Sequence, residues 1–260
     1  QVVVGELQRA DDREQPAWGL AQWHSRRTIA GVNPVSLASG ALAFSNEAKT
    51  IILGGPEADL TLGVNAFWEY EGKAREKGQS WPHLLASQAF ENSPSLAELG
   101  ALRYRVSVRL LKAEAHDAPG LSPQLHAAQF LSFITLQNRN RHSKGYGDFV
   151  WFGIPLYDSR WRIPHSFIAP DVAHHKLIYT PPGETYTEES VHDGEWVHID
   201  RDILPLMHQA LNTAWERGCL LDSRDLSDYR LGSMSIGWEV PGPLDVEMQV
   251  KGLGLMSESR

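Results

Sequence analysis

The sequence predicts an antiparallel β-sandwich or jelly roll that carries one short α-helix. Several segments alternate apolar and polar residues with the period of two that is typical of strands buried on one side, whereas one segment, at about residues 202–217, has the spacing of a helix. Strands and helices also do not alternate along the chain, as they would around a parallel sheet. The pattern therefore favours two packed antiparallel sheets.

The first part of the chain is expected to be a lead-in followed by short strands. Residues 1–34 are polar and show no period, so we expect an irregular segment there. Residues 35–260 are expected to form a single sandwich domain, a length at which one all-β domain is common. Glycine and proline separate short predicted strands. These lie near residues 35–44, 48–54 and 60–70.

Residues 103–112 give the clearest strand prediction. Tyr104, Val106, Val108 and Leu110 form one face, and Arg103, Arg105, Ser107 and Arg109 form the other. Such a strand buries its apolar face and presents a row of guanidinium groups on the opposite side. Arginine suits bidentate recognition of carboxylates, so this arginine face can neutralise acidic neighbours or bind an anionic sugar.

The second half of the chain contains central strands and the helix. Residues 130–137 and 149–156 are apolar on both faces, which indicates the middle of a sheet, and a basic loop at residues 138–148 joins them. The helix has a buried stripe at Leu204, Met207, Leu211 and Trp215. An aspartate at position 200 or 202 can cap its start, and Gly218 stands where a helix ends.

Residues 232–251 are predicted to form a β-hairpin with one acidic face. Apolar residues alternate on both sides of Pro241-Gly242-Pro243, which we take as the turn. Glu239 would then lie opposite Asp245, and Gly237 opposite Glu247, with the glycine leaving room for a ligand. Like charges at such short range destabilise a sheet unless something compensates them.

Three interpretations of this acidic face remain open. Two carboxyl groups among Glu239, Asp245 and Glu247 can act as acid and base, or as acid and nucleophile, in glycoside hydrolysis. Carboxylate oxygens can instead bind Ca²⁺, although no cofactor is required by the first interpretation. Alternatively, the face is exposed to solvent and neighbouring arginine or lysine side chains neutralise it.

Residues in aromatic and basic loops are the predicted substrate contacts. The chain has nine tryptophans, several in polar surroundings, and their flat apolar faces suit the C–H face of a sugar ring. Loops also concentrate binding residues. The candidates are Trp23, His24, Arg105, His142, Tyr146 and Trp151.

Composition excludes several classes of protein. The net charge of −8 argues against a nucleic-acid partner, and no apolar run approaches the length of a membrane helix. Cys219, the single cysteine, excludes internal disulfides and multi-cysteine zinc sites. No histidine pair has the spacing of a helical zinc motif, and we predict no metal site there. Nucleotide-binding glycine loops and the Gly-x-Ser-x-Gly elbow are also absent.

Many alternating strands, one short helix and the spaced acids of Trp238-Glu239 and Asp245-Val246-Glu247-Met248 resemble the concanavalin A-like lectin and glucanase sandwich. The resemblance covers about residues 35–256 in architecture but only some twenty residues in motif. The Glu-x-Asp-x-x-Glu signature of laminarinase-type members is absent. The resemblance implies a polysaccharide or oligosaccharide lying across a concave sheet.

The function predicted from the sequence is therefore a glycan-active protein, most simply a glycoside hydrolase. A non-catalytic carbohydrate-binding protein or lectin remains open, as does a polysaccharide lyase that uses His142, Tyr146 and the arginine face. A structural module without a sugar ligand is a further alternative. The first residue is glutamine rather than methionine, which indicates either a removed leader or a trimmed chain. With the first of these, we expect a secreted or periplasmic location.

Overall fold

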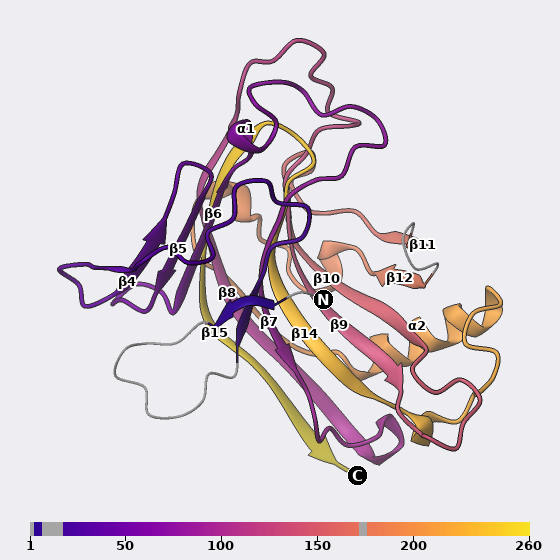
Figure 1. Cartoon of the computed structure of the whole chain (residues 1–260). Helices are drawn as coiled ribbons and strands as arrows, with labels where there is room; N and C mark the ends of the chain where they lie inside the picture. Colours follow the sequence, from indigo (N-terminus) through magenta and orange to yellow (C-terminus); the bar gives the residue numbers. More distant parts are fainter. Residues whose placement is uncertain (1–2, 7–17, 172–175) are drawn as a thin grey trace.

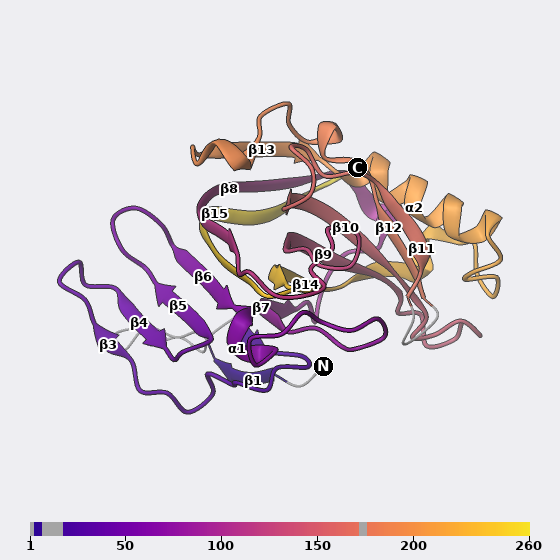
Figure 2. The ribbon, with the colours of Figure 1, turned by 90° about the horizontal axis from the view of Figure 1, so that it is seen from above.

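The computed structural model describes residues 3–6, 18–171 and 176–260, which form two β-sheets packed face to face (Figures 1 and 2). Sheet A has the strand order β1-β2-β7-β14-β9-β10-β12-β11, and sheet B has the order β13-β8-β15-β6-β5-β4-β3. Within the described strands, β10 and β12 pair in parallel and every other pair is antiparallel. The predicted sandwich is confirmed.

The strands of sheet A are β1 (Val3–Glu6), β2 (Gly19–Ala21), β7 (His83–Ala89), β9 (Gln129–Asn138), β10 (Phe149–Asp158), β11 (Phe167–Pro170), β12 (Leu177–Thr180) and β14 (Tyr229–Glu239). The strands of sheet B are β3 (Val35–Ser36), β4 (Leu42–Ser45), β5 (Lys49–Leu53), β6 (Leu60–Asn65), β8 (Leu99–Ala115), β13 (Val197–Asp202) and β15 (Leu244–Ser259). The segment expected to be irregular thus supplies β1 and β2 at the edge of sheet A. A domain boundary at residue 34 stays a prediction.

The main helix, α2 (Leu204–Glu216), confirms the helix predicted near residues 202–217. It follows β13 directly and lies beside the β10 to β12 side of sheet A (Figure 2). The carboxylate of Asp202 accepts a hydrogen bond from the Leu204 amide at 3.1 Å, and Gly218 follows the helix with a left-handed φ of +79°. A second, one-turn helix, α1 (Ala66–Glu69), replaces the end of a predicted strand.

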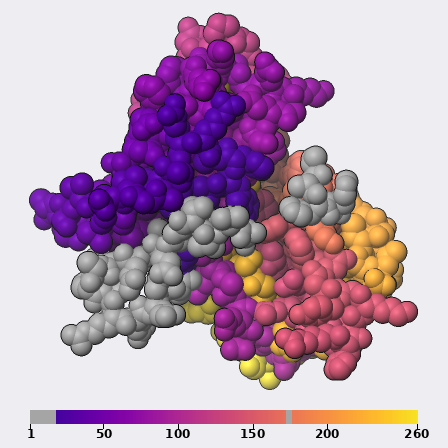
Figure 3. All heavy atoms as spheres, in the orientation of Figure 1, coloured from indigo at the N-terminus to yellow at the C-terminus, as the bar shows by residue number. Residues whose placement is uncertain are grey.

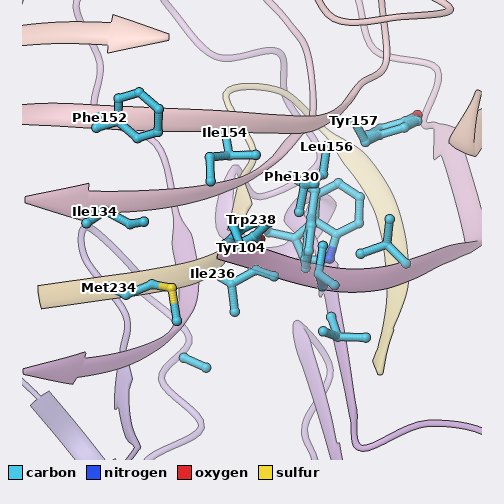
Figure 4. Close-up of a cluster of buried hydrophobic side chains, with 14 of the residues drawn as sticks. Tyr104, Phe130, Ile134, Phe152, Ile154, Leu156, Tyr157, Met234, Ile236 and Trp238 are labelled. Carbon is cyan, nitrogen blue, oxygen red and sulfur yellow. The ribbon is translucent and has the colours of Figure 1, made fainter. Parts of the chain in front are cut away.

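Two hydrogen bonds between buried polar groups cross the core and connect the sheets. The indole Nε1–H of Trp238 on β14 donates to the Leu62 carbonyl on β6 at 2.8 Å. The hydroxyl groups of Tyr104 on β8 and Ser132 on β9 lie 2.6 Å apart. Both aromatic side chains are fully buried, and Figure 4 shows them in the middle of the apolar cluster, near Phe130. Large apolar rings with one satisfied polar atom hold the two sheets together here.

We expect Trp238→Phe to lower the free energy of unfolding by about 2–4 kcal/mol, because the change leaves a cavity and removes the buried N–H donor. Trp68→Phe is the matched control, since Trp68 is 44% exposed and its loss should cost less than about 0.5 kcal/mol. Urea unfolding of the two variants measures the difference. Equal midpoints for both would contradict this account of the core.

Candidate functional site on the outer face of sheet A

The predicted hairpin at residues 232–251 is wrong, because its two strands belong to different sheets. β14 pairs with β7 and β9 in sheet A, whereas β15 pairs with β6 and β8 in sheet B. Trp238 and Val246 both face the core, so Glu239 lies on the outer face of sheet A, and Asp245 and Glu247 lie on the outer face of sheet B. The structure therefore does not bring the three acids together.

Residues 240–243 cross from one sheet to the other instead of forming a tight turn. The guanidinium of Arg75 donates to the carbonyls of Pro241 at 3.1 Å and Leu125 at 2.9 Å, and the Tyr70 hydroxyl donates to the Val240 carbonyl at 3.0 Å. A Cβ on Gly242 would lie 2.7 Å from the His126 side chain. The crossing is thus fixed by loops that are distant in sequence.

On the outer face of sheet B, a lysine rather than an arginine neutralises the acids. Lys112 contacts Asp245 at 2.6 Å, and the Asn65 amide donates to the same carboxylate at 3.0 Å. Burial, and then the charge of Asp245, raises the pKa of Glu247. These groups line a small open hollow between β5, β6 and β15.

The predicted arginine face lies on this same side of the molecule and is already paired. Arg103 and Arg105 both contact Asp200 on β13, while Arg109 donates to Gln249 at 2.8 Å and contacts Glu57 at 3.2 Å. Arg105, predicted to bind substrate, is therefore on the face opposite Glu239 and engaged in an ion pair.

The outer face of sheet A carries one row of polar side chains across four neighbouring strands. His83 on β7 is paired with Glu239 on β14, Glu239 with Gln129 on β9, and Gln129 with Asp158 on β10. Directly opposed residues share a face, so all four point outward. Figure 3 shows the molecule from this side, with the gold atoms of β14 visible between the purple segments and the pink to orange ones.

Glu239 is partly buried and held by two neighbours. The indole Nε1–H of Trp81 donates to its Oε2 atom at 3.2 Å, and the Nε2 atom of His83 lies 3.6 Å from the same oxygen. Its side chain is 20% exposed. Burial raises the pKa of Glu239, but the charge of His83 and the hydrogen bond from Trp81 more than offset this, so the pKa lies below its ordinary value of 4.5. The negative charge of Asp171, just after β11, acts in the opposite direction.

Asp158, at the far end of the row, is neutralised. Arg160 forms a bidentate ion pair with it at 2.5 and 2.8 Å, and Gln129 donates to it at 2.8 Å. Its side chain is only 5% exposed. This carboxylate has no capacity left for a second role as an exposed acid or base.

Trp23 and His24 lie next to the Glu239 site. Their rings are 5.3 and 6.1 Å from the ring of His83, and the Trp23 carbonyl accepts a hydrogen bond from the His83 amide at 3.0 Å. His24 has a left-handed φ of +55°, which marks a sharp turn of this segment. The structure thus places two predicted substrate contacts beside His83, which itself contacts the predicted catalytic residue Glu239.

A buried ion pair fixes this N-terminal segment. The carboxylate of Glu69 accepts hydrogen bonds from the amides of Arg26 and Arg27, and it also contacts the ammonium of Lys49, which donates to the Arg27 carbonyl. The side chains of Lys49 and Glu69 are 0% and 2% exposed. Burial lowers the pKa of Lys49, and Glu69 counteracts this effect.

Trp151 lies on the same outer face but farther along the strands. It packs edge-on against Phe133 and Phe149, with centroid distances of 6.1 and 5.1 Å. It pairs with Thr135, six residues along β9 from Gln129, which corresponds to about 20 Å. His142 and Tyr146 lie in the loop that joins the end of β9 to the start of β10, at the same edge of the sheet as Trp151. Neither residue therefore belongs to the Glu239 site.

Sequence reasoning missed His83, Trp81, Gln129 and Asp171. The segment at residues 81–90 can be read from sequence as a strand or a turn, and only its pairing with β14 reveals that His83 faces Glu239. The interpretation of Gly237 was also wrong. A Cβ there would lie 2.1 Å from the Leu84 carbonyl, and its φ is +153°, so the glycine allows close approach of β7 rather than of a ligand.

No family model matches the chain, and no curated protein matches its sequence. Similar folds occur among solved structures. A cellulase derived from that of Rhodothermus marinus is 13% identical over 92% of this chain and 100% of its own, with a TM-score of 0.48. The family 11 xylanase from Neocallimastix patriciarum is 10% identical over 93% and 92%, with a TM-score of 0.46.

The family 12 xyloglucanase from Bacillus licheniformis is 10% identical over 87% of this chain and 97% of its own, with a TM-score of 0.48. These are likenesses of architecture alone. They assign no residue of this chain a role.

Two further observations concern ligands and membranes. Among the described residues, no group of three or more histidine, cysteine, aspartate or glutamate side chains is arranged to hold a metal ion. Binding of Ca²⁺ stays a prediction. In the same part of the chain, none of the helices is long and apolar enough to cross a membrane.

We expect Glu69→Gln to lower the free energy of unfolding by about 3–5 kcal/mol, because the buried ammonium of Lys49 loses its counter-charge. Glu47→Gln is the control, since Glu47 is 46% exposed and meets Arg27 at 3.4 Å, a contact worth less than about 1 kcal/mol. Chemical unfolding of both variants measures the effect. A loss no larger than that of the control would contradict a structural role for the buried pair.

The pH dependence of stability tests the environment of Glu239. Because its pKa in the folded protein lies below 4.5, the ionised carboxylate adds stability above that pH, and this contribution disappears as the pH falls through the folded-state value. Wild type should therefore lose more stability than Glu239→Gln on acidification from about pH 5 to about pH 3, measured by urea unfolding. If stability fell equally with pH in both proteins, the neighbours of Glu239 would not stabilise its ionised carboxylate.

Proposed function

We propose that the protein hydrolyses glycosidic bonds in a polysaccharide or oligosaccharide bound on the outer face of sheet A, with Glu239 as a catalytic carboxyl group. The observation that carries this proposal is the setting of Glu239. It is a partly exposed carboxylate, oriented by Trp81 and His83, with the ring of Trp23 next to His83. Aromatic faces beside an oriented carboxylate suit a sugar ring whose bond is to be cleaved.

Hydrolysis adds water across the bond between the anomeric carbon and the leaving oxygen. One carboxyl group gives a proton to the leaving oxygen, and the other takes a proton from water or first forms a bond to the sugar. Asp171 is the proposed second group, because its charge already acts on the ionisation of Glu239. Asp158 is a poorer choice, since Arg160 and Gln129 occupy it.

A non-catalytic glycan-binding protein is the second candidate. The ion pair between Asp158 and Arg160 favours this second candidate. Because of it, the polar row across β7, β14, β9 and β10 contains no second carboxylate without a counter-charge. The lyase alternative loses its geometric basis, because the arginine face lies on sheet B and the loop with His142 and Tyr146 is distant from Glu239. A secreted or periplasmic location is part of the proposal, since structural polysaccharides lie outside the cytoplasm.

The test is incubation of the protein with β-glucans, xyloglucan, xylan and uronate-containing glycans, with products followed by reducing-end release and mass spectrometry. We expect wild type to cleave at least one glycan, and Glu239→Gln to lose at least about 10³-fold in rate, as removal of a catalytic acid or base does. Asp171→Asn should also be strongly impaired. Glu247→Gln is the matched control on the opposite face and should retain wild-type activity.

Loss of activity in Glu247→Gln but not in Glu239→Gln would contradict the proposal that catalysis takes place on the outer face of sheet A. Binding of a glycan without products, weakened by Trp23→Ala, would favour the binding protein over the hydrolase. An ultraviolet-absorbing unsaturated product would instead establish lyase chemistry.

A further inference from the structure

We propose that His83 is a positioning residue that keeps Glu239 ionised and leaves its Oε1 atom as the oxygen that faces the substrate. The identity of the substrate rests on the proposed function, but the relation between the two side chains does not. Four contacts of the described residues carry this inference: two that fix the imidazole of His83 and two that meet on one oxygen of Glu239.

The first pair of contacts fixes the position and protonation of the imidazole. His83 Nδ1 lies 3.0 Å from the carbonyl oxygen of Trp81, which can only accept a hydrogen bond, so Nδ1 carries a proton. The His83 amide is held by the Trp23 carbonyl at 3.0 Å, which fixes the start of β7. The remaining nitrogen, Nε2, must then face Glu239 either with a second proton or with a bare lone pair.

The second pair of contacts converges on a single oxygen. Trp81 Nε1 lies 3.2 Å and His83 Nε2 lies 3.6 Å from Oε2 of Glu239. The charge of His83 lowers the pKa of Glu239, so this neighbour favours the ionised carboxylate. No hydrogen bond or ion pair to Oε1 is found among the described residues. Oε2 is therefore the anchored oxygen of Glu239, and within this part of the chain Oε1 has no such contact.

Trp81 supplies both orienting contacts from one residue. Its main-chain carbonyl sets the protonation of His83, and its indole N–H holds Glu239 directly. Its ring also stacks on the imidazole, at a centroid distance of 6.1 Å and an interplanar angle of 24°. The Trp81-Pro82-His83 segment therefore acts as one unit, in which the proline limits the freedom of the backbone between the two side chains.

Other charged and titratable groups surround this pair. His24 lies on the N-terminal segment, with its ring 6.1 Å from that of His83. Asp171 acts on Glu239 from the end of β11, and Arg75 lies 5.3 Å from the centre of the Trp81 ring. Among these groups, His83 makes the direct contact with the carboxylate. An ionised Glu239 suits the base or nucleophile, which assigns the proton-donating role to the second carboxyl group.

The test compares the titration of the Glu239 carboxyl carbon by ¹³C NMR in wild type, His83→Gln and Trp81→Phe, with Glu239→Gln used to assign the signal. We expect the pKa of Glu239 to rise by about 1 unit or more in His83→Gln, because the attracting charge is lost. Trp81→Phe should cause a smaller rise, since it removes a neutral donor but keeps the carbonyl that orients His83. An unchanged pKa in His83→Gln would overturn the proposal.

Two further readings keep the test decisive. In wild type, ¹⁵N spectra should show a proton on His83 Nδ1 throughout the pH range in which the protein is folded, and an unprotonated Nδ1 would contradict the geometry. If a glycan is cleaved, the acidic limb of the kcat/KM profile should move to higher pH in His83→Gln, by the shift measured for Glu239. If no glycan is cleaved, the titration still decides the role of His83 while the proposed hydrolase fails.

Discussion

The alternation of side chains along β14 is the constraint on which the rest of the structure depends. Trp238 points inward and bonds across the core to the Leu62 carbonyl, so the next residue, Glu239, must point outward. A slip of one residue would bury the carboxylate and expose the indole. The inward position of Trp238, which makes one of the two hydrogen bonds that cross the core, therefore also determines the face on which the candidate site lies.

The site itself depends on segments that are distant in sequence. β14 brings Glu239, the start of β7 brings His83, and the N-terminal segment brings Trp23 and His24. The buried pair of Lys49 and Glu69 anchors this last segment through the amides of Arg26 and Arg27 and the carbonyl of Arg27. Burying two charges is costly unless each is paired and hydrogen-bonded, and here both conditions are met.

Much of the fold could be predicted from periodicity. The helix at Leu204–Glu216 and the inward and outward faces of β8, β14 and β15 agree with the sequence pattern. The pairing of β14 and β15 could not be predicted, because a period of two assigns a side chain to a face but not a strand to a partner. Pro241-Gly242-Pro243 is compatible with a tight turn or with a crossing between sheets. The pairing of β14 with β7 and β9, and of β15 with β6 and β8, decides between them.

The candidate site was only partly predictable for the same reason. Glu239, Trp23 and His24 were selected as separate residues, and the structure places them together. Asp245 and Glu247 join the predicted site only if residues 232–251 form a hairpin, which they do not. The need for Gly237 comes from the close approach of β7, and the sequence does not show that this strand is its neighbour. His83 carries no local signal, since an isolated histidine at the start of a strand acquires meaning only from the residue opposite it.

We infer that the ligand binds, and the chemistry takes place, on the outer face of sheet A. The most direct measurement is a crystal structure of the Glu239→Gln variant soaked with an oligosaccharide. We expect sugar rings against Trp23 and Trp81, with a sugar oxygen or the anomeric carbon close to the atom that replaces Oε1. Sugar bound instead over Asp245 and Glu247, on the outer face of sheet B, would contradict it.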